Sequence, residues 1–114
     1  MRLLDTDAII DQLRTKEHQP GAISVITLIE VLRGTNREKR TTVKELLEES
    51  YPTVNLDNDS ILTYCDLYAK LKEEGQTLPD ADLLIASAAI SRGIPLETRD
   101  AHFQRLTTHG LELT

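Results

Sequence analysis

The chain has 114 residues, 39% of them hydrophobic and 28% charged, which is the composition of a folded domain rather than of a disordered segment. Its net charge of −6 means that a role in nucleic-acid binding would need a local basic patch, a bound cation, or both. The single cysteine, Cys65, excludes an internal disulfide and a cysteine-based zinc site, and we expect it to be a small buried hydrophobe.

The amino terminus has no long apolar run behind a basic segment, and no stretch approaches the roughly 20 apolar residues of a membrane span. We therefore predict no signal peptide, no membrane partner and a cytoplasmic location. Since no linker or internal repeat is visible, we expect a single domain over residues 1–114.

The first half of the chain alternates short strands with helices. We expect a strand at residues 2–5, a helix at 6–14 and, after a Pro-Gly loop, extended residues at 22–24. Ser24 is the expected cap of a helix over residues 25–33 that ends at Gly34. An amphipathic helix over residues 36–50, with Val43, Leu46 and Leu47 on its apolar side, precedes a strand at residues 51–56.

The second half continues this alternation. A long helix should begin near Asp57 and end at Gly75, and its predicted buried side consists of Ile61, Cys65, Leu67, Tyr68 and Leu71. Residues 81–93 are apolar almost all round, which predicts a central helix. A strand at 94–98, a helical turn at 100–106 and a last edge strand at 111–114 complete the chain. Strands alternating with helices predict an α/β protein with a mostly parallel sheet covered on both faces.

Four acidic residues lie beside apolar elements, at strand ends or in or near helix beginnings: Asp5, Glu30, Asp82 and Asp100. Each has a simple structural explanation, as a helix cap, as a charge that favours the helix dipole, or as a boundary residue. If a parallel sheet gathers them at one edge, they would instead repel one another unless hard divalent cations such as Mg²⁺ or Mn²⁺ bind there. The residues alone leave both interpretations open.

Four motifs in chain order, LLDTDAII, SVITLIEVLRG, DLLIASAAISRG and LETRDAHFQRL, closely resemble the PIN domain family. Within this family they are most similar to the VapC toxins of toxin–antitoxin pairs, and the resemblance runs from residue 2 to about residue 106. It implies a three-layer α/β/α sandwich around a sheet of four to five mostly parallel strands. It also implies a Mg²⁺- or Mn²⁺-dependent endoribonuclease, in which metal-activated water hydrolyses an RNA phosphodiester bond.

By match to these motifs, the resemblance assigns the catalytic and metal-binding roles to Asp5, Glu30, Asp82 and Asp100, with Asp5 and Asp82 as the expected direct ligands. Thr98 and Thr6 are the expected supporting residues. Asp7 stands where the family often has a small polar residue, so we expect an outer role at best. Glu97 replaces a residue that is usually apolar in the family.

The resemblance also implies three partners: an RNA substrate, a second copy of the chain in a homodimer, and a VapB-like antitoxin that places a helix or tail, often with an arginine, in the acidic groove. Five of the thirteen basic residues fall between positions 33 and 44, which makes this segment a candidate RNA or partner surface. The candidate RNA-binding residues are Arg33, Arg37, Arg40 and Arg99.

Two other functions are compatible with parts of the sequence. Asp5 and Asp7, two residues apart after a strand, resemble the catalytic pair of haloacid-dehalogenase-like phosphatases, in which Asp5 would be the nucleophile. Ile9 and the absence of a well-placed Lys with a downstream Gly-Asp pair argue against this alternative. A non-catalytic binding module of the same fold is the other alternative, and the presence of all four acids argues against it.

Overall fold

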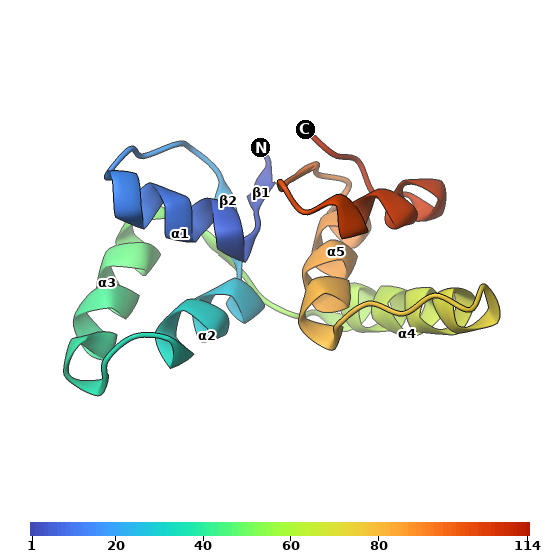
Figure 1. The fold of residues 1–114 in the computed structure, drawn as a ribbon, viewed down its shortest axis with the longest axis horizontal. Helices are drawn as coiled ribbons and strands as arrows, with labels where there is room; N and C mark the ends of the chain where they lie inside the picture. The colour runs from blue at the N-terminus through green and yellow to red at the C-terminus, as the bar shows by residue number, and fades with distance from the viewer.

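A four-stranded parallel sheet crosses the middle of the molecule, in a computed structural model that describes residues 1–114. The strand order is β3-β2-β1-β4, and the strands are very short: β1 Leu3–Leu4, β2 Ala22–Ser24, β3 Thr53–Val54 and β4 Leu96–Glu97. Figure 1 shows β1 and β2 between two groups of helices. The helices are α1 Thr6–Thr15, α2 Val25–Arg33, the 3₁₀ helix η1 Arg37–Lys39, α3 Arg40–Ser50, α4 Asn58–Glu73, α5 Asp80–Arg92 and the 3₁₀ helix η2 Ala101–His109.

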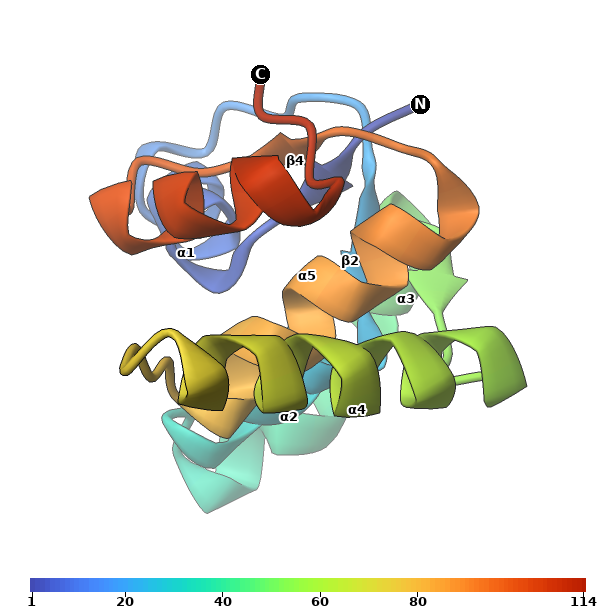
Figure 2. The ribbon, with the colours of Figure 1, turned by 90° about the vertical axis from the view of Figure 1, so that its right-hand side faces the viewer.

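Successive residues of β1 and of β2 point into different cores, because strand side chains alternate between the two faces of a sheet. Leu3 and Ala22 belong to a core formed with α4, α5 and η2, whereas Leu4 and Ile23 belong to a second core formed with α1, α2 and α3. Figure 2, viewed from the side of the first core, shows α4 and η2 in front of α5. The sheet therefore separates two helical layers, and the predicted α/β fold class is confirmed.

The strand order reverses at β1, and this reversal locates the candidate site. The chain adds β2 and then β3 on one side of β1, but β4 pairs with its other side. In open α/β sheets, the crevice outside the carboxyl ends of the strands at such a switch point is where ligands bind. Asp5 and Thr98 directly follow β1 and β4, and the Asp5 N–H donates a hydrogen bond of 3.2 Å to the carbonyl of Glu97.

Glu97 has a structural explanation that the sequence did not provide. Its Oε1 lies 2.8 Å from Nη1 of Arg2. Arg2 directly precedes β1, Glu97 is the last residue of β4, and these two strands pair with each other. The Arg2 guanidinium also donates to the side chain of Gln19. Glu97 thus forms an ion pair that joins β4 to the residue before β1.

The predicted buried side of α4 is wrong in part. Leu67 and Leu71 are buried, but Ile61 and Tyr68 are about half exposed and Cys65 is exposed. The reason is the packing of α4 against α5, which is fixed near the beginning of α4 by a hydrogen bond of 3.0 Å between the hydroxyls of Ser60 and Ser91. Because Ser60 faces α5, the next two side chains, Ile61 and Leu62, face solvent.

Two smaller predictions are also corrected. The helix expected over residues 36–50 is broken into η1 and α3, and Leu46, expected on its apolar side, is 50% exposed. The predicted end of α2 at Gly34 is confirmed, and the φ of −88° there is one that any residue can adopt. The last edge strand is a single bridge between Leu113 and Leu96.

No helix of the structure combines the length and the apolar character that a membrane crossing requires.

Candidate functional site

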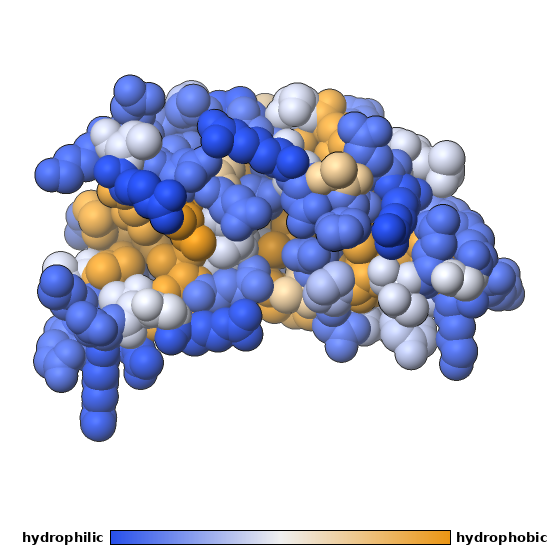
Figure 3. Space-filling view, viewed as in Figure 1, coloured by the Kyte–Doolittle hydropathy of each residue, from blue (hydrophilic) through white to orange (hydrophobic).

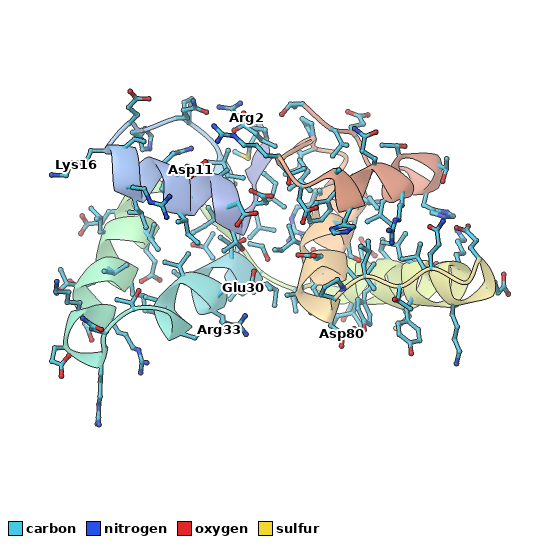
Figure 4. All side chains as sticks on the ribbon, in the orientation of Figure 1. Arg2, Asp11, Lys16, Glu30, Arg33 and Asp80 are labelled. Carbon is cyan, nitrogen blue, oxygen red and sulfur yellow. The ribbon has the colours of Figure 1, made fainter.

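The four predicted acids come from four different elements around the crevice. Asp5 is the N-cap of α1, directly after β1, and Asp100 is the N-cap of η2, three residues after β4. Glu30 lies in the second half of α2, and Asp82 lies in the first turn of α5. Figure 4 shows Glu30 on the part of α2 that faces toward α5.

Asp82 lies in the negative field of the other acids. Burial raises the pKa of its carboxyl above the usual 3.8, and the charges of Asp100, Glu30 and Asp5 raise this pKa further, followed by the charge of Asp7. No hydrogen bond to Asp82 offsets this effect. Because a Coulomb interaction weakens with distance, the acids that act on Asp82 belong to its surroundings.

Asp5 is the most enclosed of the four acids, with 4% of its surface exposed. Burial raises the pKa of its carboxyl, and the charges of Asp7 and Asp100 act in the same direction. Hydrogen bonds from the Thr98 hydroxyl and from the Ala8 N–H oppose this increase. Thr98, predicted as a supporting residue, also accepts a hydrogen bond of 3.0 Å from the Asp100 N–H, so it connects two of the acids.

Asp5 and Asp100 can each cap a helix and still belong to a metal site. Oδ1 of Asp5 accepts from the Ala8 N–H at 2.9 Å, and Oδ1 of Asp100 accepts from the His102 N–H at 2.9 Å. Each cap uses one carboxylate oxygen, and a carboxylate has a second oxygen with free lone pairs. Capping therefore orients these two side chains without removing them as potential ligands.

Glu30 is held by neighbours on α1 and α2. The Thr6 hydroxyl donates a hydrogen bond of 2.6 Å to Oε1 of Glu30, while its oxygen lies 3.2 Å from the hydroxyl of the buried Thr27. Nη2 of Arg33 is 3.7 Å from Oε2 of Glu30. Thr27 was not among the predicted site residues, although a threonine three residues before an isolated Glu in an apolar helix was a usable signal.

The chemistry of this set of side chains fits a divalent cation. Four carboxylates provide the oxygen ligands that Mg²⁺ and Mn²⁺ prefer, and a cation would relieve the mutual repulsion that raises the pKa of Asp82. In the structure as it stands, no three acidic, histidine or cysteine side chains are close enough together to hold a metal ion. Mg²⁺ does not need three protein ligands, because one or two carboxylates usually hold it and water completes its coordination.

The four predicted RNA-binding arginines do not form one group. Arg33 is beside Glu30, whereas Arg99 pairs with Asp11 at 2.9 Å, and Nε of Arg40 donates to the carbonyls of Leu32 and Thr35. Arg37 begins the exposed 3₁₀ helix η1. The structure brings only Arg33 to the acids by a direct contact.

The raised pKa values predict how the stability of the metal-free protein depends on pH. Asp5 and Asp82 bind protons more tightly in the folded than in the unfolded chain, so the free energy of unfolding should increase as the pH falls from 7 through their folded pKa values toward 3.8. Below this range, Asp57 acts in the opposite direction, because its hydrogen bond from the Ser60 N–H lowers the pKa of its carboxyl.

Thermal unfolding in EDTA across this pH range measures the effect. The Asp82→Asn variant should show a smaller increase in Tm on acidification than the parent protein. An identical increase in both proteins would show that Asp82 does not have a raised pKa.

Comparison with known proteins agrees with this architecture. The sequence profile of the PIN domain family matches residues 2–108. The chain is 36% identical over 115 residues to Ribonuclease VapC1 from Methanocaldococcus jannaschii, covering 97% of this chain and 85% of that protein. Among solved structures, VapBC-1 from nontypeable Haemophilus influenzae is similar with a TM-score of 0.83 at 28% identity, covering 99% of this chain and 96% of that chain.

DNA-bound VapBC from Salmonella typhimurium has the same fold, with a TM-score of 0.86 at 23% identity over 100% of this chain and 98% of that chain. The profile match covers nearly the whole chain, and it includes all four of the acids described above. The chain belongs to the PIN domain family.

Proposed function

We propose that the protein is a metal-dependent endoribonuclease and the toxin of a VapBC-type toxin–antitoxin pair. The observation that carries this proposal is the group of four carboxylates around the unpartnered Asp82, at the switch point of a parallel sheet. The relative called Ribonuclease VapC1 and the structural neighbours called VapBC support the same activity and the same kind of partner.

In this proposal, Asp5, Glu30, Asp82 and Asp100 hold Mg²⁺ or Mn²⁺. A bound ion of this kind supplies an activated water and stabilises the negative charge that develops at the phosphate. The residues of the chain do the rest of the positioning. Thr6 fixes the carboxylate of Glu30, and Thr98 connects Asp5 with Asp100.

Arg33 is the basic residue best placed to contact RNA beside the acids. It is well exposed, with 73% of its side chain accessible, and its ion pair with Glu30 is long. An exposed ion pair of this kind contributes little to stability, so Arg33 can exchange it for a substrate phosphate at small cost.

An exposed apolar area supports the proposed antitoxin partner. Figure 3 shows apolar side chains gathered between α1, α2 and α3. The exposed large hydrophobic residues on these helices are Ile10, Leu13, Ile29 and Leu46. Ile29 is adjacent to Glu30, so a helix that covers this area would end near the acids, where an arginine of the partner could pair with them. We expect the toxin to form a homodimer as well.

A cleavage assay with purified protein tests the proposal. We expect single-stranded RNA to be cut internally in the presence of Mg²⁺ or Mn²⁺, with no cutting in EDTA, and induction in cells to arrest growth unless the antitoxin is co-expressed. RNA that remains intact under all metal conditions would contradict the proposal and favour a binding module. A hydroxylamine-sensitive aspartyl-phosphate would instead identify a phosphatase.

A further inference from the structure

A small pocket lies between α4, residues 76–78 and the first turn of α5, the helix that carries Asp82. Its volume is about 150 Å³, well below the ~300–1,000 Å³ of sites for drug-sized ligands, so it can hold one planar group. Its floor is apolar, because Leu71, Leu78 and Leu83 are all buried. Leu83 directly follows Asp82, so the floor and the acid site share the beginning of α5.

The rim of this pocket is polar and has one aromatic wall. Lys72, Gln76 and Thr77 are exposed around the opening, and Tyr68, 50% exposed, forms the wall. We call this feature the Tyr68 pocket. An apolar floor with an aromatic ring and amide, hydroxyl and ammonium groups at the opening matches the needs of a nucleobase, which stacks through its face and forms hydrogen bonds through its edge.

Two contacts connect the pocket with the first turn of α5, the helix that carries Asp82. The ring of Tyr68 is stacked on that of Tyr64, with centroids 6.2 Å apart and an angle of 29° between the planes. The Tyr64 hydroxyl donates a hydrogen bond of 2.7 Å to Asp80, which raises the pKa of Tyr64 to about 12 and keeps it a donor. Figure 4 shows Asp80 at the beginning of α5, in the same first turn as Asp82.

The pocket is held in shape by the chain that closes it. Residues 75–79 run back along α4 to α5 (Figure 1), and the Gln76 N–H donates a hydrogen bond of 2.8 Å to the carbonyl of Leu71. Arg105 of η2 donates to the carbonyl of Thr77. A preformed pocket needs little ordering when a ligand binds.

The charges at the pocket suit a nucleic acid strand. The protein is acidic overall, yet Lys72 at the rim forms none of the ion pairs in the structure. Its ammonium group is therefore free to approach a phosphate. The combination of an available cation and an aromatic wall favours a nucleotide over the apolar side chain of a protein.

We propose that the Tyr68 pocket binds one unpaired nucleobase of the RNA substrate, near the bond that is cut. This inference rests on the proposed ribonuclease function and adds a determinant of base preference to it. Tyr68 stacks on the base, Gln76 and Thr77 contact its edge, and Lys72 contacts a neighbouring phosphate. The strand that reaches the pocket then passes the four carboxylates.

The test uses a short single-stranded RNA in which one nucleotide at a time is replaced by an abasic ribose. With the parent protein, one position near the cleavage site should show a loss of kcat/KM of about tenfold or more, which is the usual scale of base–aromatic stacking. Tyr68→Ala should lower kcat/KM for the intact RNA by a similar factor, mainly through KM, and should remove the penalty at that abasic position. Tyr68→Phe should behave like the parent.

Ile61→Ala is the matched control, because Ile61 lies on α4 with 47% exposure but outside the pocket. It should leave cleavage and the abasic profile unchanged. The same abasic profile in Tyr68→Ala and in the parent would overturn the inference and leave the ribonuclease function intact. A changed molar mass of Tyr68→Ala in light scattering, or weakening of the antitoxin complex alone, would also overturn it, since the pocket would then hold a protein side chain.

Binding without cleavage separates the two proposals. In EDTA, the affinity for the fluorescently labelled RNA should fall about tenfold in Tyr68→Ala. If the parent cuts no RNA under any metal condition but this loss of affinity is seen, the ribonuclease function fails and the base-binding pocket stands. Equal affinities of the two proteins in EDTA would show that the pocket does not bind RNA.

Discussion

Replacement of Asp82 by asparagine should reduce RNA cleavage by about 100-fold or more without unfolding the protein. Asparagine keeps the size of the side chain but removes the charge, and losing one preorganised charged group of an active site commonly costs 10²–10³ in kcat. Asp82 is the strongest choice because it has no capping hydrogen bond to lose. Single-turnover cleavage with excess Mg²⁺, in parallel with thermal unfolding, measures both effects.

The metal-free Asp82→Asn protein should be as stable as the parent or more stable by a few degrees in Tm, because the substitution removes a charge that burial and neighbouring acids disfavour. Mg²⁺ should raise the Tm of the parent more than that of the variant. Asp59→Asn is the matched control, since Asp59 is also in the first turn of a helix but is exposed on α4. Unchanged cleavage by Asp82→Asn would remove Asp82 from the site.

Gly21→Ala should destabilise the protein by about 1–3 kcal/mol, the usual cost of forcing an extra methyl group into a packed core. A Cβ at this position would lie 2.8 Å from Cγ and 3.0 Å from Cδ1 of Leu4, and 3.2 Å from the carbonyl oxygen of Arg2. Leu4 is fully buried and cannot move aside easily. Urea unfolding measures the loss of stability.

The same substitution should also lower cleavage, because Leu4 is the residue before Asp5 and a displaced β1 moves this carboxylate. Gly34→Ala provides the control, since a Cβ there would meet its nearest atom, the carbonyl oxygen of Val31, at 3.6 Å and the φ of −88° suits alanine. It should leave stability unchanged or slightly increased. Equal stability of both variants would show that the close approach of Gly21 to β1 is unimportant.

The order of strands and helices could be predicted because local signals mark their ends. Pro20 and Gly21 precede β2, Ser24 caps α2, and Asp57 caps α4, as the structure confirms. These signals act within a few residues, so they are readable without knowledge of the tertiary structure. They located even strands of two residues, which periodicity alone would not reveal.

The buried face of α4 could not be predicted in this way. Apolar residues occur on two sides of this helix, and periodicity does not say which side meets the core. The choice is made by α5, through the contact of Ser60 with Ser91 and the burial of Leu67 and Leu71. Such contacts join residues about thirty positions apart, which a single sequence does not pair.

The candidate site, too, could be predicted from the sequence only in part. The sequence indicated Asp5, Glu30, Asp82 and Asp100 by their motifs, and the structure surrounds Asp82 with the charges of the other three. Their roles as ligands stay predictions. The hydrogen bond from Thr6 to Glu30 and that from Tyr64 to Asp80 connect different helices, so neither was visible in the order of residues.

Asp5 and Asp100 are both helix caps and proposed metal ligands, and this affects which substitution should be used to inactivate the protein for binding experiments with an antitoxin. Asp5→Ala removes a helix cap together with the charge, and such a loss typically costs about 1 kcal/mol, so weaker binding of an antitoxin could reflect a frayed α1. Asp5→Asn keeps an oxygen for the Ala8 N–H and removes only the charge. For the same reason, when a growth selection yields a variant that is no longer toxic, its melting temperature should be measured before the loss of toxicity is attributed to a loss of catalysis.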